Sequence, residues 1–365
     1  MLHNKTIAVV VPCYNEETQI GMVIETMPEF VDRIIIVNDA SKDKTSQVVL
    51  KHVEKSKGKG LKVARPAIVD SINIFDRADV LVSQKEAMEL PLYPQFTIVN
   101  NTPESDRVIL LNHKFNFGKG AGIITGYKFC KDWGFDCIAA MDGDGQMDPR
   151  ELESICTPVV SENIDYVKGN RLIHRSAWLI IPKVRFFGNS VLSILTKLAS
   201  GYWRVSDTQT GYTAISRKAI NSFPIHSIYK SYGYPNDILV KLNIAMCTLR
   251  EVEIKPIYNV GEQSKMNIAK VIPTVSYLLL KSFFKRLWVK YLFRDFHPLF
   301  LLYNFSFIMF FGSVPLGIKI VSKVVHEAAL NPITLLGFGF LILTAIQFLL
   351  FAMWMDIQDN ERLYR

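Results

Sequence analysis

The chain has 365 residues, of which 49% are hydrophobic, and a formal net charge of +8. This apolar content is high for a soluble enzyme and low for a transporter with many membrane spans. The five cysteines have no Cys-x-x-Cys spacing. We therefore expect neither a zinc site nor a disulfide framework, and predict reduced cytosolic thiols.

The first part of the chain predicts a β-α-β unit. Residues 6–11 read as a β-branched strand stopped by Pro12, residues 17–27 have the spacing of an amphipathic helix, and residues 33–37 read as the next strand. Further alternation of strands and helices predicts a mostly parallel sheet flanked by helices. Polar residues follow both strands, so we expect a nucleotide to lie at that edge of the sheet.

The segment MDGDGQ at residues 141–146 carries the clearest chemical signal. It follows the apolar run 137–140, so Asp142 and Asp144 are expected at the end of a strand, facing a cleft. Carboxylate oxygens are the ligands that hard divalent ions such as Mg²⁺ prefer. The segment therefore predicts a site for a metal ion and a diphosphate.

Two other interpretations of this segment stay open. A solvated turn is one, because Asp and Gly both favour turns for local reasons. A calcium loop is the other, because residues 142, 144, 146 and 153 fall at positions one, three, five and twelve of such a loop. Its sixth position requires glycine and holds Met147, and Pro149 and the preceding strand are foreign to a helix-loop-helix, which disfavours the calcium loop.

The apolar excess is concentrated near the end of the chain. Residues 298–318 and 332–355 carry no charge and are long enough to cross a bilayer, so they predict a two-helix transmembrane hairpin. A pair of buried core helices is the alternative, which Tyr303 and Trp354 near the ends of the runs disfavour.

Basic and aromatic residues interleave in the juxtamembrane segment 266–297, which predicts amphipathic helices in the headgroup layer. This placement favours a lipid bilayer over a nucleic acid as the partner of the positive charge. By the positive-inside rule, the large N-terminal part and both termini are expected in the cytosol. The basic residues are Lys281, Lys285, Arg286, Lys290 and Arg294.

Taken together, these motifs resemble the inverting family 2 glycosyltransferases of GT-A fold, in the polyprenyl-phosphate (dolichol-phosphate mannose synthase-like) branch. Residues 9–17, VVVPCYNEE, are similar to the opening strand and loop of that family. Residues 37–45 resemble its Asp-Asp-x-Ser-x-Asp-x-Thr element, with Asn38 in place of the first Asp, and residues 142–146 match its Asp-x-Asp-x-Gln. The resemblance covers nearly the whole chain except an insert at about residues 57–106.

The resemblance implies an α/β GT-A domain, a Rossmann-like mixed sheet flanked by helices, over residues 1–265. It assigns the nucleotide to Pro12, Tyr14, Glu16, Asp39, Lys119 and Asp142. It assigns a Mg²⁺ or Mn²⁺ cofactor to Asp142, Asp144 and Gln146. The glycine-rich residues 118–122 on their own favour helix packing over phosphate binding.

The resemblance also assigns the acceptor side of the site. Residues 167–171 contain a Gly-x-Arg element ending at Arg171, and residues 207–212 place Asp207 as the candidate base. A lipid phosphate is already ionised near neutral pH, so Asp207 is expected to orient as much as to catalyse; a helix N-cap is its alternative role. Lys265, after a late strand at residues 254–258, is expected to contact the leaving diphosphate or a lipid headgroup.

The helix at residues 191–199 is expected either in the core or at the membrane face, where the resemblance places it. The predicted activity transfers a sugar from a nucleotide sugar, UDP favoured over GDP, to undecaprenyl or dolichyl phosphate, with Asp144, Arg171, Asp207 and Lys265 as the catalytic group. A membrane-bound polysaccharide synthase and a nucleotide-binding adaptor without activity are the alternatives. The identity of the sugar and the formation of a homo-oligomer stay open.

Overall fold

A mixed sheet organises the computed structural model, which describes every residue except 64, 66–72, 182, 259–267 and 328. Among these residues the strand order is β3-β4-β2-β1-β5-β7-β6-β8. Neighbours pair in parallel except β3 with β4 and β7 with both β5 and β6. The strands are β1 (Ile7–Cys13), β2 (Arg33–Asn38), β3 (Phe96–Ile98), β4 (Val108–His113), β5 (Cys137–Ala140), β6 (Tyr166–Asn170), β7 (Thr213–Ser216) and β8 (Leu249–Glu253).

Helices cover both faces of this sheet, and the alternation of side chains along β1 shows how. Ala8 and Val10 point to a core shared with α4 and α9, whereas Val9 and Val11 point to a second core shared with α1, α2 and α5. A strand that is buried on both faces requires a continuous apolar run. The helices of the domain are α1 (Ile20–Glu25), α2 (Thr45–Lys55), α3 (Arg77–Glu89), α4 (Lys119–Asp132), α5 (Leu152–Ser161), α6 (Ala177–Ile180), α7 (Lys183–Ser200), α8 (Arg217–Ile220) and α9 (Tyr234–Ile244).

Two strand predictions need correction. The first strand continues through Pro12 instead of stopping there. Its pairing with β5 already ends at Val10, so no backbone hydrogen bond of the sheet requires an N–H at Pro12. The late strand lies at Leu249–Glu253, ahead of the predicted residues 254–258. This strand pairs with β6 near the edge of the sheet and is only partly buried, so its sequence is polar and lacks the apolar pattern of a strand.

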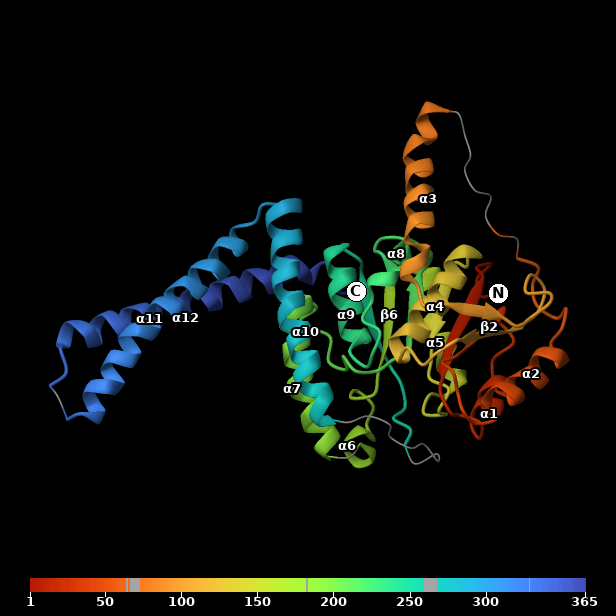
Figure 1. The fold of residues 1–365 in the computed structure, drawn as a ribbon, viewed down its shortest axis with the longest axis horizontal. Helices are drawn as coiled ribbons and strands as arrows, with labels where there is room; N and C mark the ends of the chain where they lie inside the picture. Colours follow the sequence, from red (N-terminus) through yellow and green to blue (C-terminus); the bar gives the residue numbers. More distant parts are fainter. Residues whose placement is uncertain (64, 66–72, 182, 259–267, 328) are drawn as a thin grey trace.

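The insert at residues 57–106 adds an edge strand and a projecting helix. β3 pairs with β4 as the outermost strand, and α3 stands away from the body of the domain (Figure 1). Arg33 ties the two ends of the insert together, because its guanidinium donates to the carbonyls of Leu61 at 2.7 Å and Glu104 at 3.2 Å. Short 3₁₀ turns complete the segment at Ile74–Asp76 and Leu90–Leu92.

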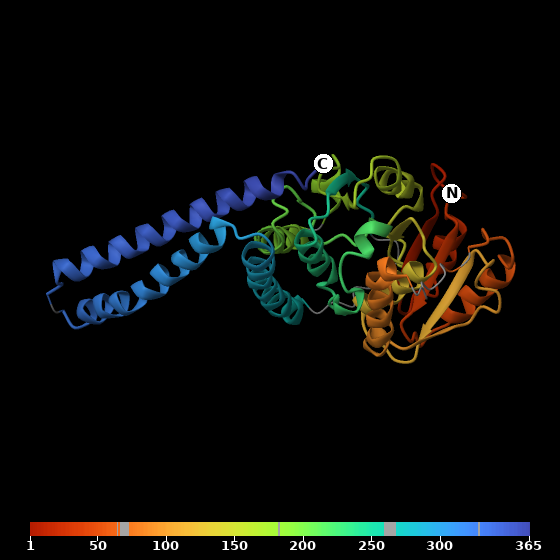
Figure 2. The same cartoon turned by 90° about the horizontal axis from the view of Figure 1, so that it is seen from above.

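Two long apolar helices, α11 (Pro298–Val325) and α12 (Pro332–Glu361), extend from the sheet domain as a hairpin (Figure 1). Both are long and apolar enough to cross a membrane, and both run past the spans predicted from the sequence. At the base of the hairpin, α7 lies beside α10 (Ile268–Trp288), which continues into a π-helical turn, Val289–Arg294 (Figures 1 and 2). These helices therefore form the side of the domain from which the hairpin projects.

The helix α7 has one side in the core and an apolar side that is exposed, and its place at a membrane face stays a prediction. Leu192 and Leu198 are half-buried and pack against the core that α7 shares with α9 and α10. Val191, Ile194 and Leu195 are exposed on its other side. The exposed face of α10 is likewise apolar, with Leu280, Phe284 and Trp288, and it carries Lys281 and Lys285.

The chain returns from the hairpin to the edge of the sheet. Leu249 in β8 donates its backbone N–H to the carbonyl of Leu363 at 2.7 Å, and Arg365 donates to the carbonyl of Leu249 at 2.9 Å. Tyr364 forms a parallel bridge with Leu249. Because residue 365 pairs with the sheet domain, both ends of the chain lie on the same side of the hairpin.

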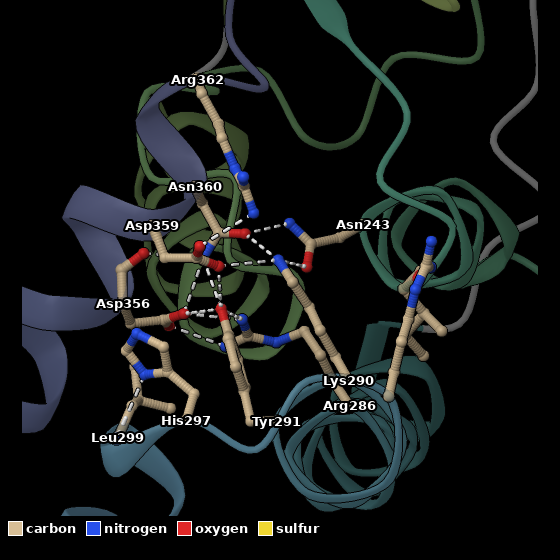
Figure 3. Close-up of polar contacts among 12 residues, drawn as sticks. Asn243, Arg286, Lys290, Tyr291, His297, Leu299, Asp356, Asp359, Asn360 and Arg362 are labelled. Carbon is tan, nitrogen blue, oxygen red and sulfur yellow. Dashed lines mark hydrogen bonds and ion pairs between the residues drawn. The ribbon is translucent and has the colours of Figure 1, made fainter.

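A buried polar network fastens the end of α12 to α10 (Figure 3). The Arg286 guanidinium donates to both oxygens of Asp356 at 2.7 Å, and neither side chain is exposed. The same guanidinium donates to the carbonyls of Leu198 and Ala199 at the end of α7. Gly201, with φ of +77°, leaves room for it, since a Cβ there would lie 3.0 Å from Cζ of Arg286.

The second half of the network surrounds a buried lysine. Lys290 donates to Asn360 at 2.5 Å and to Asn243 of α9 at 3.1 Å, and pairs with Asp359 at 3.2 Å. Two of the five basic residues predicted to face lipid, Arg286 and Lys290, are therefore turned inward. The sequence could not show this, because their carboxylate partners lie about 70 residues later in the chain.

We expect Arg286→Met to lower the stability of the protein strongly. The substitution leaves the Asp356 carboxylate buried without its partner, which costs about 3–5 kcal/mol. Arg204→Met is the matched control, because Arg204 also pairs with α12, through Glu361, but at an exposed site worth at most about 1 kcal/mol. Thermal unfolding in detergent measures both, and equal shifts of the two midpoints would contradict the structural role of Arg286.

Candidate active site

One edge of the sheet collects the loops that the sequence singled out. The strands β4, β2, β1 and β5 run parallel, so the loops after them emerge at a common edge. Because β7 is antiparallel to both β5 and β6, its start lies at this edge together with the end of β6. The topology thus brings residues 141–146 close to Arg171 and to the segment before β7.

The loops after β1 and β2 are joined by hydrogen bonds. Asn15, with φ of +56°, accepts from the N–H of Lys42 at 2.8 Å, and the N–H of Glu16 donates to Thr45 at 2.8 Å. Tyr14 and Glu16 are half-buried at the edge of the sheet. Both residues therefore sit on a loop with a fixed path.

Asp39 has a structural role that the sequence did not reveal. Its buried carboxylate accepts hydrogen bonds from His113 Nδ1 at 2.7 Å and from the N–H groups of Phe117 at 2.9 Å and Gly118 at 2.8 Å. It thus holds the loop from which α4 begins. Asn38, the departure from the family pattern, accepts from the N–H of Ser41 at 3.1 Å and shapes the adjoining turn.

The glycines of α4 allow close packing, as the sequence favoured. A Cβ on Gly122 would lie 2.8 Å from Cβ of Pro12, so this glycine lets the helix approach β1 at Pro12. Lys119, in the first turn of the helix, points toward residues 141–146. Its ammonium donates to Oδ2 of Asp142 at 2.6 Å.

The carboxylates of Asp142 and Asp144 lie together beyond the end of β5. Asp142 is buried and Asp144 is half-buried, and an oxygen of Asp144 accepts from the N–H of Gln146 at 3.0 Å. Burial and the charge of Asp142 raise the pKa of Asp144 to about 6. A divalent cation between the two carboxylates would relieve the repulsion that Asp142 exerts on the ionised form of Asp144.

The ligand set is small, which also bears on the choice of metal. Among the described residues, no group of three or more His, Cys, Asp and Glu side chains is placed to hold an ion. Mg²⁺ is commonly bound by one or two carboxylates together with the phosphates of a substrate. Asp142, Asp144 and the half-buried Gln146 fit such a site better than a calcium loop, which requires a ring of protein oxygens.

Arg171 and Asp207 form a bidentate ion pair next to this site. Arg171 donates from Nε to Oδ2 of Asp207 at 2.8 Å and from Nη2 to Oδ1 at 3.0 Å, and Asp207 is buried. Burial opposes ionisation of Asp207, but the charge and hydrogen bonds of Arg171 lower its pKa below the ordinary value. A carboxylate held ionised in this way is suited to orienting a partner and is a weak base.

The sequence matches the model of the glycosyl transferase family 2 over residues 8–67 and 97–223. The chain is a family 2 glycosyltransferase. The unmatched residues 68–96 fall inside the insert. The mixed sheet, the sheet-edge site and this match confirm the GT-A architecture and the resemblance drawn from the sequence.

Two named relatives resemble this glycosyltransferase over most of their length. It is 28% identical to a UDP-N-acetylglucosamine--dolichyl-phosphate N-acetylglucosaminyltransferase of Methanococcus voltae, over 70% of this chain and 87% of the relative. It is 23% identical to the dolichyl-phosphate beta-glucosyltransferase ALG5D of Trichomonas vaginalis, over 77% of this chain and 74% of the relative. Among solved structures, glucosyl-3-phosphoglycerate synthase from Mycobacterium tuberculosis has a TM-score of 0.45 and 16% identity, covering 78% of this chain and 80% of that one.

The structure adds three residues to the site of this glycosyltransferase and leaves one predicted residue aside. Glu251 accepts from the N–H of Asp207 at 3.1 Å, and Lys168 and Tyr234 lie buried next to the same loop. The sequence held one signal for Lys168, because a charged residue inside an otherwise buried strand indicates a role other than packing. Lys265 lies outside the described residues.

We expect the pH dependence of transfer between about pH 5.5 and 8 to contain no ionisation of Asp207. The pKa of Asp207 is lowered, so its side chain is fully ionised at every pH above the ordinary pKa of an aspartate. It loses its negative charge only in more acidic solution. Asp207→Asn should therefore lower kcat/KM by a similar factor at every pH in this range. A wild-type acidic limb that disappears in Asp207→Asn, measured at saturating Mg²⁺, would contradict this.

Proposed function

We propose that this glycosyltransferase transfers a sugar from a UDP-sugar to a polyprenyl phosphate held in the bilayer, with inversion at the anomeric carbon. One observation carries the acceptor class. The segment that bears Asp207 is hydrogen-bonded to α7, since Ser193 donates to the carbonyl of Ser206 at 2.7 Å and contacts Thr208 at 3.1 Å. The acceptor side of the site thus adjoins the apolar helix at the base of the hairpin.

The names of the relatives support the same class. The Methanococcus voltae protein is named for UDP-N-acetylglucosamine and dolichyl phosphate, and the Trichomonas vaginalis protein for a glucosyl transfer to dolichyl phosphate. Because the two names differ in the sugar and agree in the lipid, they support a polyprenyl-phosphate acceptor. They leave the sugar of this chain to experiment.

In the proposed mechanism, an oxygen of the lipid phosphate displaces the nucleoside diphosphate from the anomeric carbon. Asp144 and Gln146, with Asp142, would hold Mg²⁺ or Mn²⁺, and the ion would neutralise charge on the leaving diphosphate. Lys119 balances the charge of Asp142. Arg171 binds Asp207 through Nε and Nη2, and its guanidinium would also contact the acceptor phosphate, a group that a positioned guanidinium binds well.

A transfer assay tests the proposal directly. Purified protein in detergent is supplied with Mg²⁺ or Mn²⁺, undecaprenyl or dolichyl phosphate, and a panel of labelled UDP- and GDP-sugars. We expect label in a lipid monophosphate sugar from one UDP-sugar. Label in a long polymer or a soluble acceptor would overturn the proposed acceptor and favour a polysaccharide synthase or another family 2 activity.

We expect Asp144→Ala to leave the fold intact and to lower turnover by at least about 100-fold, because the charge developing on the diphosphate loses its counterion site. Glu153→Ala is the control, since Glu153 is exposed on α5 and would be a ligand only in a calcium loop. Turnover at saturating metal measures both variants. Near-normal turnover of Asp144→Ala, or an equal loss in Glu153→Ala, would contradict the assignment of the metal site.

We also propose that the catalytic domain and both termini face the cytosol. In intact cells, a membrane-impermeant maleimide should then label a cysteine at Glu327, in the loop between α11 and α12, and spare one at Lys218 on the catalytic domain. The five native cysteines are buried, so background labelling should be low. Labelling of Lys218→Cys but not Glu327→Cys would reverse the orientation.

A further inference from the structure

A buried lysine lies between the two halves of the site. Lys168 is in the middle of β6 and its side chain is fully buried. Its strand partner is Thr213 in β7, and Thr213 is in turn the partner of Ala140 in β5. Lys168 therefore shares a row of the sheet with Ala140, two residues before Asp142.

The ammonium of Lys168 holds the loop that enters β7. It donates a hydrogen bond to the carbonyl oxygen of Thr210. The next residue, Gly211, lies in a narrow gap, because a Cβ there would be 2.6 Å from the Tyr234 hydroxyl and 3.4 Å from Oδ1 of Asp142. The path of this loop therefore sets how Asp142 and Asp207 lie relative to each other.

Charged groups from four surrounding segments act on this ammonium. They are Asp207 on the loop, Glu251 on β8, Arg171 after β6 and Asp142 after β5. Burial lowers the pKa of Lys168 to about 8, against the opposing effect of the three carboxylates. An apolar side chain would fill a buried strand position without this desolvation cost, so the charge points to a role beyond packing.

We propose that Lys168 is a positioning residue for sugar transfer: by holding the Thr210 carbonyl, it fixes the 207–211 loop and thereby the placement of the Arg171–Asp207 pair against Asp142. The inference rests on the proposed function, because it places the acceptor side against the donor side. Displacement of a reacting group by about 1 Å lowers the rate about 100-fold. The donor KM should change little, because Tyr14 and Asp39 lie on the other half of the sheet.

The test compares Lys168→Met with Lys128→Met in the full-length protein. Lys128 is also a buried lysine, paired with Asp132, but it lies near the far end of α4. Release of UDP from the UDP-sugar is measured with lipid acceptor present. We expect Lys168→Met to lower kcat about 100-fold with a donor KM and a thermal midpoint near those of the wild type. Lys128→Met should keep wild-type kcat.

A second variant, Lys168→Arg, distinguishes an effect on loop position from an effect on stability. It also keeps the inference testable if Lys168→Met does not fold. The wild-type kcat should fall as the pH rises through about 8, where the ammonium loses its proton, and Lys168→Arg should remain active there because its guanidinium stays charged. Wild-type kcat in Lys168→Met, or the same alkaline limb in Lys168→Arg as in the wild type, would overturn the inference. Wild-type UDP release without lipid labelling would instead contradict the proposed acceptor and leave the kcat comparison valid.

Discussion

The ion pair between Arg286 and Asp356 joins two parts of the molecule that are built for different surroundings. Arg286 belongs to the helix that lies against the sheet domain, and Asp356 to the second helix of the apolar hairpin. The guanidinium also binds two backbone carbonyls in the last turn of α7, so one side chain holds α7, α10 and α12 together. A hinge at this point would let the sheet domain tilt, whereas a buried network with satisfied donors holds it at one angle.

The position of the site follows from this fixed angle. The loop with Asp207 leads from α7 into β7 and is hydrogen-bonded to α7. Its position relative to the hairpin is therefore set by the same helix that Arg286 holds. On the other side, Asp142 and Asp144 are set by β5 in the centre of the sheet. Three cations, Lys119, Lys168 and Arg171, face four carboxylates at the site, so one negative charge is in excess when all of them are ionised; the carboxylates are those of Asp142, Asp144, Asp207 and Glu251.

The sequence predicted the features that short stretches determine. The strand at residues 137–140, the placement of Asp142 and Asp144 after it and the apolar runs of the hairpin are each encoded within about 20 residues. The features that it missed are pairings across the chain. Asp39 with His113, Lys168 with Thr210 and Arg286 with Asp356 depend on which strands and helices become neighbours, and no local pattern specifies that. The insert was visible by its length, but its edge strand has only three residues and too weak a pattern.

The residues that cover the outer edge of β8 come after the hairpin in the chain. Residues 363–365 follow the hairpin, so the outer edge of β8 stays unpaired until the hairpin has been made. An uncovered edge strand is a template for pairing with another chain and promotes aggregation. A fragment cut before α11 would therefore keep an open edge at β8 as well as the bare surface of α10.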